Sequence, residues 1–198
     1  MLLTTFGFEA HYQLKQLPGS SAVGVTHVFR RQPDPEGADS ISFQSTMKGR
    51  VLEVTPTGGS AWIGTFQAGA EGLDGIFATP NADAVCVIVK GQGYWVPVLA
   101  PSQFEAIRTV PIKQVIPIAE RGALIFCSYT RLAMYGALGL SWVTEDLSWD
   151  GLEITGVRDA TLEGTAWDSP AERRVPFSVD LDTGKACGGS SPAMYRAR

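Results

Sequence analysis

Short apolar runs, separated by glycine and proline, follow one another along the whole chain. The 198 residues include 22 glycines and 12 prolines, which bound runs rich in β-branched and aromatic residues. Runs of this length and composition, closed by turn residues, are typical of β-strands. The sequence therefore predicts an all-β fold, with strands at 85–90, 94–99, 110–118, 124–128 and 175–181. Only residues 131–140, which contain alanine, leucine and methionine, would also suit a short helix.

Three aspartate-containing turns punctuate these runs. Asp74-Gly75 and Asp150-Gly151 each precede an apolar residue, as hairpin turns prefer. The triplet at 182–184, Asp-Thr-Gly, also occurs around the catalytic aspartate of aspartic proteases, whose chemistry needs two such carboxylates. The sequence contains no second copy of this triplet and little chain after it, so we interpret it as a hairpin turn.

The two halves of the chain match at several points in the same order. The matching segments, at offsets between 76 and 83 residues, are Phe43-Gln44-Ser45 with Phe126-Cys127-Ser128, Arg50-Val51 with Arg131-Leu132, Trp62-Ile63 with Trp142-Val143, Asp74-Gly75-Ile76 with Asp150-Gly151-Leu152, Asp83-Ala84 with Asp159-Ala160, and 94–98 with 175–179. Such self-similarity predicts one supersecondary unit of about 80 residues used twice.

The predicted fold is therefore an internally duplicated antiparallel meander of four to six strands per unit. Two such units can form a sandwich, a barrel or a propeller-blade-like pair. The closing stretch 177–184 resembles the last strand of some propeller blades. Within one compact globular body we expect an N-terminal strand and loop at 1–37, a first β unit at 38–100, a second at 101–187 and a flexible tail at 188–198.

Residues shared by both halves are expected to serve the scaffold. Trp62 and Trp142 should be buried, and the matched aspartates at 74 and 150 should form turns. Arg50 and Arg131 either pair with a carboxylate or cover apolar surface with their aliphatic stems. We favour the covering role for both arginines.

Charge and cysteine content exclude several classes of function. The net charge of −4 is spread evenly, with six basic and eight acidic residues in 1–100 and ten and twelve in 101–198. Such a chain lacks the basic surface that nucleic acids or anionic membranes require. The apolar stretch Gly122–Val143 carries Arg131 near its middle, which argues against a transmembrane helix. Three widely spaced cysteines without a CxxC pair argue against zinc and fit a reducing, cytoplasmic location.

Catalytic motifs are missing from the sequence. It contains no Gly-x-Ser-x-Gly elbow, and its two histidines, His11 and His27, both lie in the first thirty residues. Gly91-Gln92-Gly93 begins like a dinucleotide-binding loop but is followed by a strand-like run with a proline, so it is interpreted as a turn. We therefore predict no catalytic residue, no metal site and no cofactor.

The segment 142–150 is the one candidate for ligand binding, because it combines two tryptophans with three carboxylates. Aromatic rings stack on sugars, and paired carboxylates can hydrolyse glycosidic bonds. Glu145, Asp146 and Trp149 are the candidate binding residues. The function expected first is a non-catalytic β scaffold that binds another protein or itself; the alternative is a carbohydrate-binding or glycoside-hydrolysing protein that uses these three residues.

Overall fold

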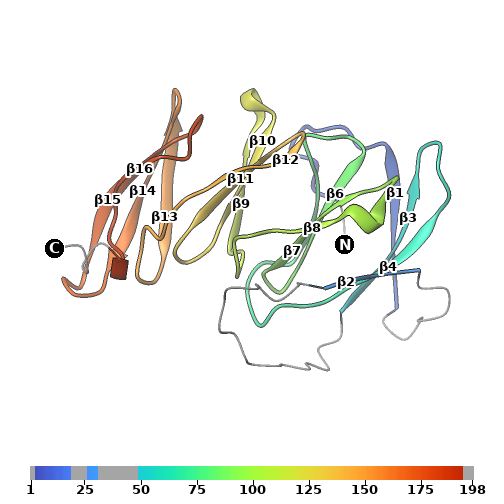
Figure 1. Ribbon diagram of the computed structural model, residues 1–198, viewed down its shortest axis with the longest axis horizontal. Helices are drawn as coiled ribbons and strands as arrows, with labels where there is room; N and C mark the ends of the chain where they lie inside the picture. The colour runs from blue at the N-terminus through green and yellow to red at the C-terminus, as the bar shows by residue number, and fades with distance from the viewer. Residues whose placement is uncertain (1–2, 19–25, 31–48, 194–198) are drawn as a thin grey trace. The chain divides into compact units, whose positions relative to one another are not determined.

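The computed structural model describes residues 3–18, 26–30 and 49–193 (Figure 1). It contains two short 3-10 helices, η1 (Pro101–Gln103) and η2 (Ala119–Arg121), and many strands. The strands are β1 (Tyr12–Leu17), β2 (His27–Phe29), β3 (Arg50–Pro56), β4 (Trp62–Phe66), β5 (Gly75–Ala78), β6 (Ala84–Val89), β7 (Gln92–Pro97), β8 (Glu105–Ala106), β9 (Gln114–Ile118), β10 (Ala123–Cys127), β11 (Leu132–Gly136), β12 (Gly139–Val143), β13 (Leu152–Arg158), β14 (Thr161–Asp168), β15 (Arg173–Asp180) and β16 (Ala186–Gly188).

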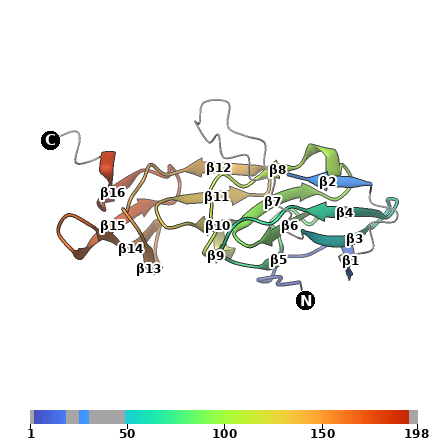
Figure 2. The ribbon, with the colours of Figure 1, turned by 90° about the horizontal axis from the view of Figure 1, so that it is seen from below.

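The chain divides into two compact units, Met1–Ile107 and Arg108–Arg198, and the described residues of each unit form two four-stranded sheets. Unit 1 holds sheet I, in the order β1-β3-β4-β2, and sheet II, in the order β5-β6-β7-β8. Unit 2 holds sheet III, in the order β12-β11-β10-β9, and sheet IV, in the order β13-β14-β15-β16. Sheets II, III and IV are antiparallel meanders of sequential strands. Figure 2 shows β13 at one edge of sheet IV.

The all-β prediction is confirmed, and no described sheet closes into a barrel. The prediction of a single meander per unit is wrong, since the described residues of each unit form two separate sheets. In sheet I the chain does not follow a simple meander, because β2 pairs parallel to β4. Residues 131–140, which would also have suited a helix, form β11 and the start of β12.

The apolar stretch Gly122–Val143 forms β10, β11 and β12, which pair with one another in sheet III. No helix in the described parts of the chain is long and apolar enough to cross a bilayer. The expected turn at 182–184 is present, and it joins the paired strands β15 and β16.

The two Asp-Gly pairs do not form hairpin turns, contrary to the sequence prediction. Asp74 directly precedes β5 of sheet II, which begins at Gly75, and so ends the connection from β4 of sheet I. Asp150-Gly151 lies between β12 of sheet III and β13 of sheet IV. Each pair thus belongs to a connection between sheets. The local sequence permits a turn at both places, but strand pairing decides which strand the turn leads to.

In unit 1, side chains of sheets I and II share one buried cluster. Phe29 stacks on Phe66 with ring centroids 4.4 Å apart, and both rings contact Tyr94 of sheet II. Trp62 is 6% exposed and donates its indole N–H to the carbonyl oxygen of Val98 at 2.8 Å. The predicted burial of Trp62 is confirmed.

In unit 2, side chains of sheets III and IV share a second buried cluster. Trp142 is 9% exposed and lies in this cluster with Leu162 and Phe177. Its indole N–H donates to the carbonyl oxygen of Leu181 at 2.9 Å. The predicted burial of Trp142 is confirmed, and the hydrogen bond ties β12 to the end of β15.

The two matched arginines form ion pairs, which corrects the expectation that their stems mainly cover apolar surface. The Nη2 atom of Arg50 lies 3.0 Å from Oδ1 of Asp74, and Arg131 pairs with Asp146. Arg50 is the first residue of β3 and Arg131 directly precedes β11. In each unit the acid follows the strand that pairs with β3 or β11, namely β4 or β12. The partner of Arg131 is therefore Asp146 and not Asp150, the residue that the repeat matches to Asp74. The matched segment Phe43-Gln44-Ser45 lies outside the described residues.

Candidate functional site

Asp146, one of the three predicted binding residues, is held by Arg131 in the connection between β12 and β13. Arg131 donates from Nε to Oδ1 at 2.6 Å and from Nη2 to Oδ2 at 3.2 Å. The hydrogen bond from Arg131, followed by one from Thr130, holds the pKa of the Asp146 carboxyl below its usual value. A two-point pair of this kind fixes the position of the carboxylate and stabilises its ionised form.

Glu145 and Trp149, the other two predicted binding residues, differ in their surroundings. Glu145 is exposed, whereas Trp149 is half-buried and donates its indole N–H to Oγ of Ser190 at 3.2 Å. The backbone N–H of Trp149 also donates to the carbonyl oxygen of Trp167 at 3.1 Å. Asp146 and Trp149 thus both take part in contacts within unit 2. Carbohydrate binding at these three residues stays a prediction.

The ion pair gives a pH-dependent prediction for Asp146. Because its folded-state pKa is lowered, it adds stability above the unfolded pKa of about 4, and that stability is lost as the pH falls through the folded value. We expect Asp146→Asn to lower the free energy of unfolding at neutral pH by about 0.5–1 kcal/mol, since the pair is half-exposed. Denaturant titrations at neutral and acidic pH measure this loss, which should vanish in acid. Glu145→Gln is the control; a loss that persists in acid would contradict the role of the pair.

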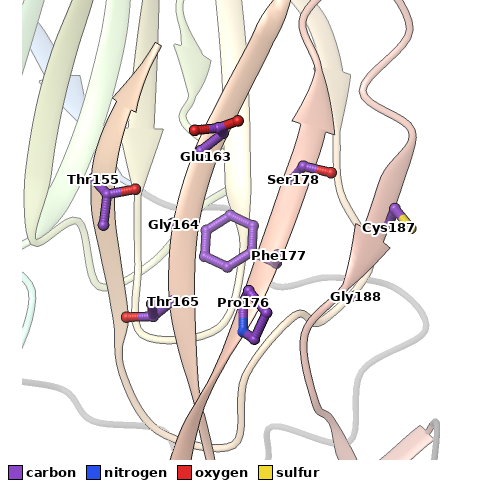
Figure 3. A pocket seen from close by; sticks show the side chains of 9 residues that line it. All are labelled: Thr155, Glu163, Gly164, Thr165, Pro176, Phe177, Ser178, Cys187 and Gly188. Carbon is purple, nitrogen blue, oxygen red and sulfur yellow. The ribbon is translucent and has the colours of Figure 1, made fainter. Parts of the chain in front are cut away.

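A hollow of about 470 Å³ lies on sheet IV (Figure 3). Its polar lining comes from neighbouring strands in register, because Glu163 lies opposite Ser178 and Ser178 lies opposite Cys187. Thr155 and Thr165 add two further hydroxyl groups. The outward face of sheet IV therefore presents a row consisting of a carboxylate, a hydroxyl and a thiol. Alternation within each strand predicts which of these residues face outward, but only strand register brings them into one row.

A second hollow, of about 570 Å³, lies beside Trp62 in unit 1. His27 contacts the edge of the Trp62 ring, with centroids 5.5 Å apart, and Leu99 and Pro101 line the opening. In unit 2, Gly184 lies against the ring of Trp142, where an added Cβ would come within 2.7 Å of the indole. The turn at 182–184 thus covers Trp142, whereas part of the surface beside Trp62 borders a hollow.

One edge of sheet IV is formed by β13, five of whose residues are exposed. Val157 is 43% exposed, which places a large apolar side chain at this edge. Glu153 and Arg158 lie near the two ends of the strand and are exposed as well. This strand was not among those predicted from the sequence, although its alternation of apolar and polar residues is visible there.

Groups with shifted pKa values are spread through the described structure and occupy structural positions. Burial raises the pKa of the Cys127 thiol to about 12 and that of the Cys86 thiol still further. Burial likewise raises the pKa of Tyr12 and Tyr94. Within residues 3–18, 26–30 and 49–193, no group of three or more His, Cys, Asp or Glu side chains is arranged to hold a metal ion.

Comparison with protein-family models found no match, and comparison with curated proteins and with solved structures found no significant similarity.

Proposed function

We propose that the protein is a non-catalytic β scaffold that binds another protein or a second copy of itself. The observation that carries this proposal is β13, an edge strand of seven residues with the exposed apolar side chain of Val157. The backbone groups on the outer side of an edge strand are a template for pairing with another chain. Proteins commonly blunt such edges with proline, charged side chains, a β-bulge or a covering segment. β13 contains no proline, and its bulge and its two charged residues, Glu153 and Arg158, leave Val157 exposed.

The arrangement of titratable groups supports a binding role over a catalytic one. Strongly perturbed pKa values gather at catalytic sites, where burial and neighbouring charges tune an acid or a base. In this protein the groups with shifted pKa values have structural roles. Asp146 pairs with Arg131, and Asp180 accepts hydrogen bonds from the turn at 182–183. The raised thiol and phenol pKa values belong to buried core positions.

We also infer that the two units arose from an internal duplication. In unit 1, Trp62 of β4 donates its indole N–H to the carbonyl oxygen of Val98, the residue after β7. In unit 2, Trp142 of β12 donates in the same way to Leu181, the residue after β15. β7 and β15 are each the third strand of the second sheet in their unit. The backbone N–H groups of these acceptor residues donate in turn to residues just before β6 and β14, each at 2.8 Å. These shared connections, together with the matched sequence segments, support a repeated unit of two sheets.

A reducing, cytoplasmic location suits this scaffold. All three cysteines are free thiols, and Cys86 and Cys127 are buried in separate units. Disulfides form and persist mainly in oxidising compartments, so free thiols fit a reducing one.

Affinity capture tests the proposed function. The full chain, tagged at one end, is used as bait in an extract of the source organism, and bound proteins are quantified against an unrelated β protein. We expect one protein, or the untagged chain added at known concentration, to be retained in stoichiometric amount at moderate salt. Val157→Lys serves as the matched bait, because it places a charge on the exposed edge and should reduce retention. Retention of neither a partner nor the chain itself would contradict the proposal.

A further inference from the structure

We propose that two copies of the chain associate edge to edge, with β13 of one copy pairing antiparallel to β13 of the other. This inference rests on the proposed function and names the partner as a second copy. β13 lies at the end of sheet IV, and among the described residues only its β14 side is paired. Alternate residues of such a strand turn their N–H and C=O groups away from the sheet.

The corresponding edge in unit 1 is covered by an extended segment. β5 is the first strand of sheet II, as β13 is of sheet IV. Thr4 donates to the carbonyl oxygen of Ile76 and accepts from the N–H of Ala78, both at 2.9 Å. Phe6 stacks on Phe77 with ring centroids 5.7 Å apart, and all four residues of β5 are buried. Within the described residues, no chain segment pairs with β13 in this way, so its edge is open to an extended strand.

A β-bulge in β13 sets which side chains share a face. The register shifts between Ile154 and Gly156, so that Glu153 lies opposite Thr165 and Arg158 lies opposite Thr161. Thr161 and Thr165 are four residues apart on β14 and therefore share a face. Glu153 and Arg158 consequently lie on one face too, although residues five apart in a regular strand would point to opposite faces.

The other face of β13 is apolar. Ile154 lies opposite Gly164 and Val157 lies opposite Leu162, which belongs to the buried cluster of unit 2. Ile154 is half-buried against this cluster, whereas Val157 remains exposed. A second strand added at this edge would extend the apolar face and cover Val157.

These two faces make β13 complementary to itself. In an antiparallel pair centred between Thr155 and Gly156, Glu153 lies opposite Arg158 of the second copy, and Ile154 lies opposite its Val157. The two-fold symmetry repeats both contacts, giving two opposite-charge pairs on one face and two apolar pairs on the other. A bulge often protects an edge from pairing. Here it lies at the centre of the strand and aligns the charges.

The expected dimer is weak. A ladder of six residues per chain buries less surface than the interface of a typical stable complex. Association therefore depends on the cross-strand pairs being complementary. This dependence makes the charges at 153 and 158 the sharpest means of testing the interface. The two positions face each other only across the symmetric dimer, because they lie at opposite ends of the same strand.

Sedimentation equilibrium of the full chain tests the proposal through charge reversal. The wild type is expected to show a concentration-dependent dimer. Glu153→Arg and Arg158→Glu should each weaken dimerisation at least tenfold, because each places like charges opposite each other twice. Mixing the two variants should restore association as a heterodimer, since one chain then carries two arginines and the other two glutamates. The double variant Glu153→Arg/Arg158→Glu should dimerise like the wild type. Glu163→Arg, the same charge reversal on the central strand β14, is the control and should leave the dimer unchanged.

Restored association also guards against misfolding, because an unfolded variant could not recover on mixing. Glu153 lies 3.5 Å from Nε of Arg174, so its loss also removes a contact within the sheet. Within the described residues Arg158 forms no such ion pair, so the reciprocal variant avoids this complication. A wild type that is monomeric at every concentration, single variants that dimerise as well as the wild type, or a mixture that stays monomeric would each overturn the inference. If the chain is monomeric yet captures a different protein in stoichiometric amount, the inference fails and the proposed function stands.

Discussion

Trp142→Ala is expected to lower the free energy of unfolding by about 3–5 kcal/mol, the usual cost of removing a large aromatic side chain from a core. The side chain is 9% exposed and lies in the cluster shared by sheets III and IV. Truncation leaves a cavity and also deprives the carbonyl of Leu181 of its indole donor. Trp62→Ala in unit 1 should cost a similar amount, because the same kind of bond joins Trp62 to Val98.

Denaturant unfolding followed by circular dichroism measures these losses. Because the chain has two units, the transition must first be shown to be two-state with a second probe such as tyrosine fluorescence. Trp142→Phe separates the contributions, since it keeps most of the apolar volume and removes the donor; we expect a loss of about 1–2 kcal/mol. Trp149→Ala, at a half-buried indole, is the matched control and should cost less than Trp142→Ala. Losses below about 1 kcal/mol at both buried tryptophans would contradict their place in the core.

Gly164→Ala is expected to destabilise the protein by about 1–3 kcal/mol, the cost of inserting a methyl group into a packed site. A Cβ at position 164 would lie 2.5 Å from the carbonyl oxygen of Glu153 and 2.6 Å from Cζ of Phe177. The first of these atoms is backbone of the neighbouring strand β13, so the strand itself would have to move. Sheet IV is the part of the chain that should loosen.

Gly156→Ala on β13 is the control for this effect. An added Cβ there has no heavy atom within 4 Å, and the residue does not have a positive φ. We expect a change within about 0.5 kcal/mol, or a slight gain from the stiffer unfolded chain. Thermal unfolding of the two variants side by side gives the comparison. Equal effects at 156 and 164 would show that glycine flexibility, and not the close approach of Phe177, matters at position 164.

Strand positions were largely readable from the sequence, because they depend on local composition. The run predicted at 85–90 corresponds to β6, the run at 124–128 to β10 and the run at 175–181 to β15, each displaced by one or two residues. All residues of β6 and β10 are buried, which explains their continuous apolar sequences. The burial of Trp62 and Trp142 also followed from the sequence, since the two halves of the chain share these residues.

The contact partners of the candidate site residues could not be predicted from the sequence. The short segment 142–150 stands out because it contains Glu145, Asp146 and Trp149 close together. Their closeness in sequence does not show which distant residues they contact. Asp146 pairs with Arg131, fifteen residues away, and Trp149 donates to Ser190, forty-one residues away. The exposed edge that carries Glu153, Arg158 and Val157 was not predicted, since nothing in the sequence marks these residues until β13 is known to be an edge strand.

That the chain forms strands, and roughly where they lie, can be predicted from the sequence alone, because strand formation depends on side chains a few residues apart. The burial of Trp62 and Trp142 was predicted from their occurrence in both halves. The division of the described strands into four sheets, the place of the Asp-Gly pairs between sheets and the bulge that puts Glu153 and Arg158 on one face are visible only in the folded structure. Strand pairing joins residues far apart in the chain, and a shift of one residue exchanges the two faces of a strand. Several pairings therefore satisfy one apolar pattern, and packing of the whole unit selects among them.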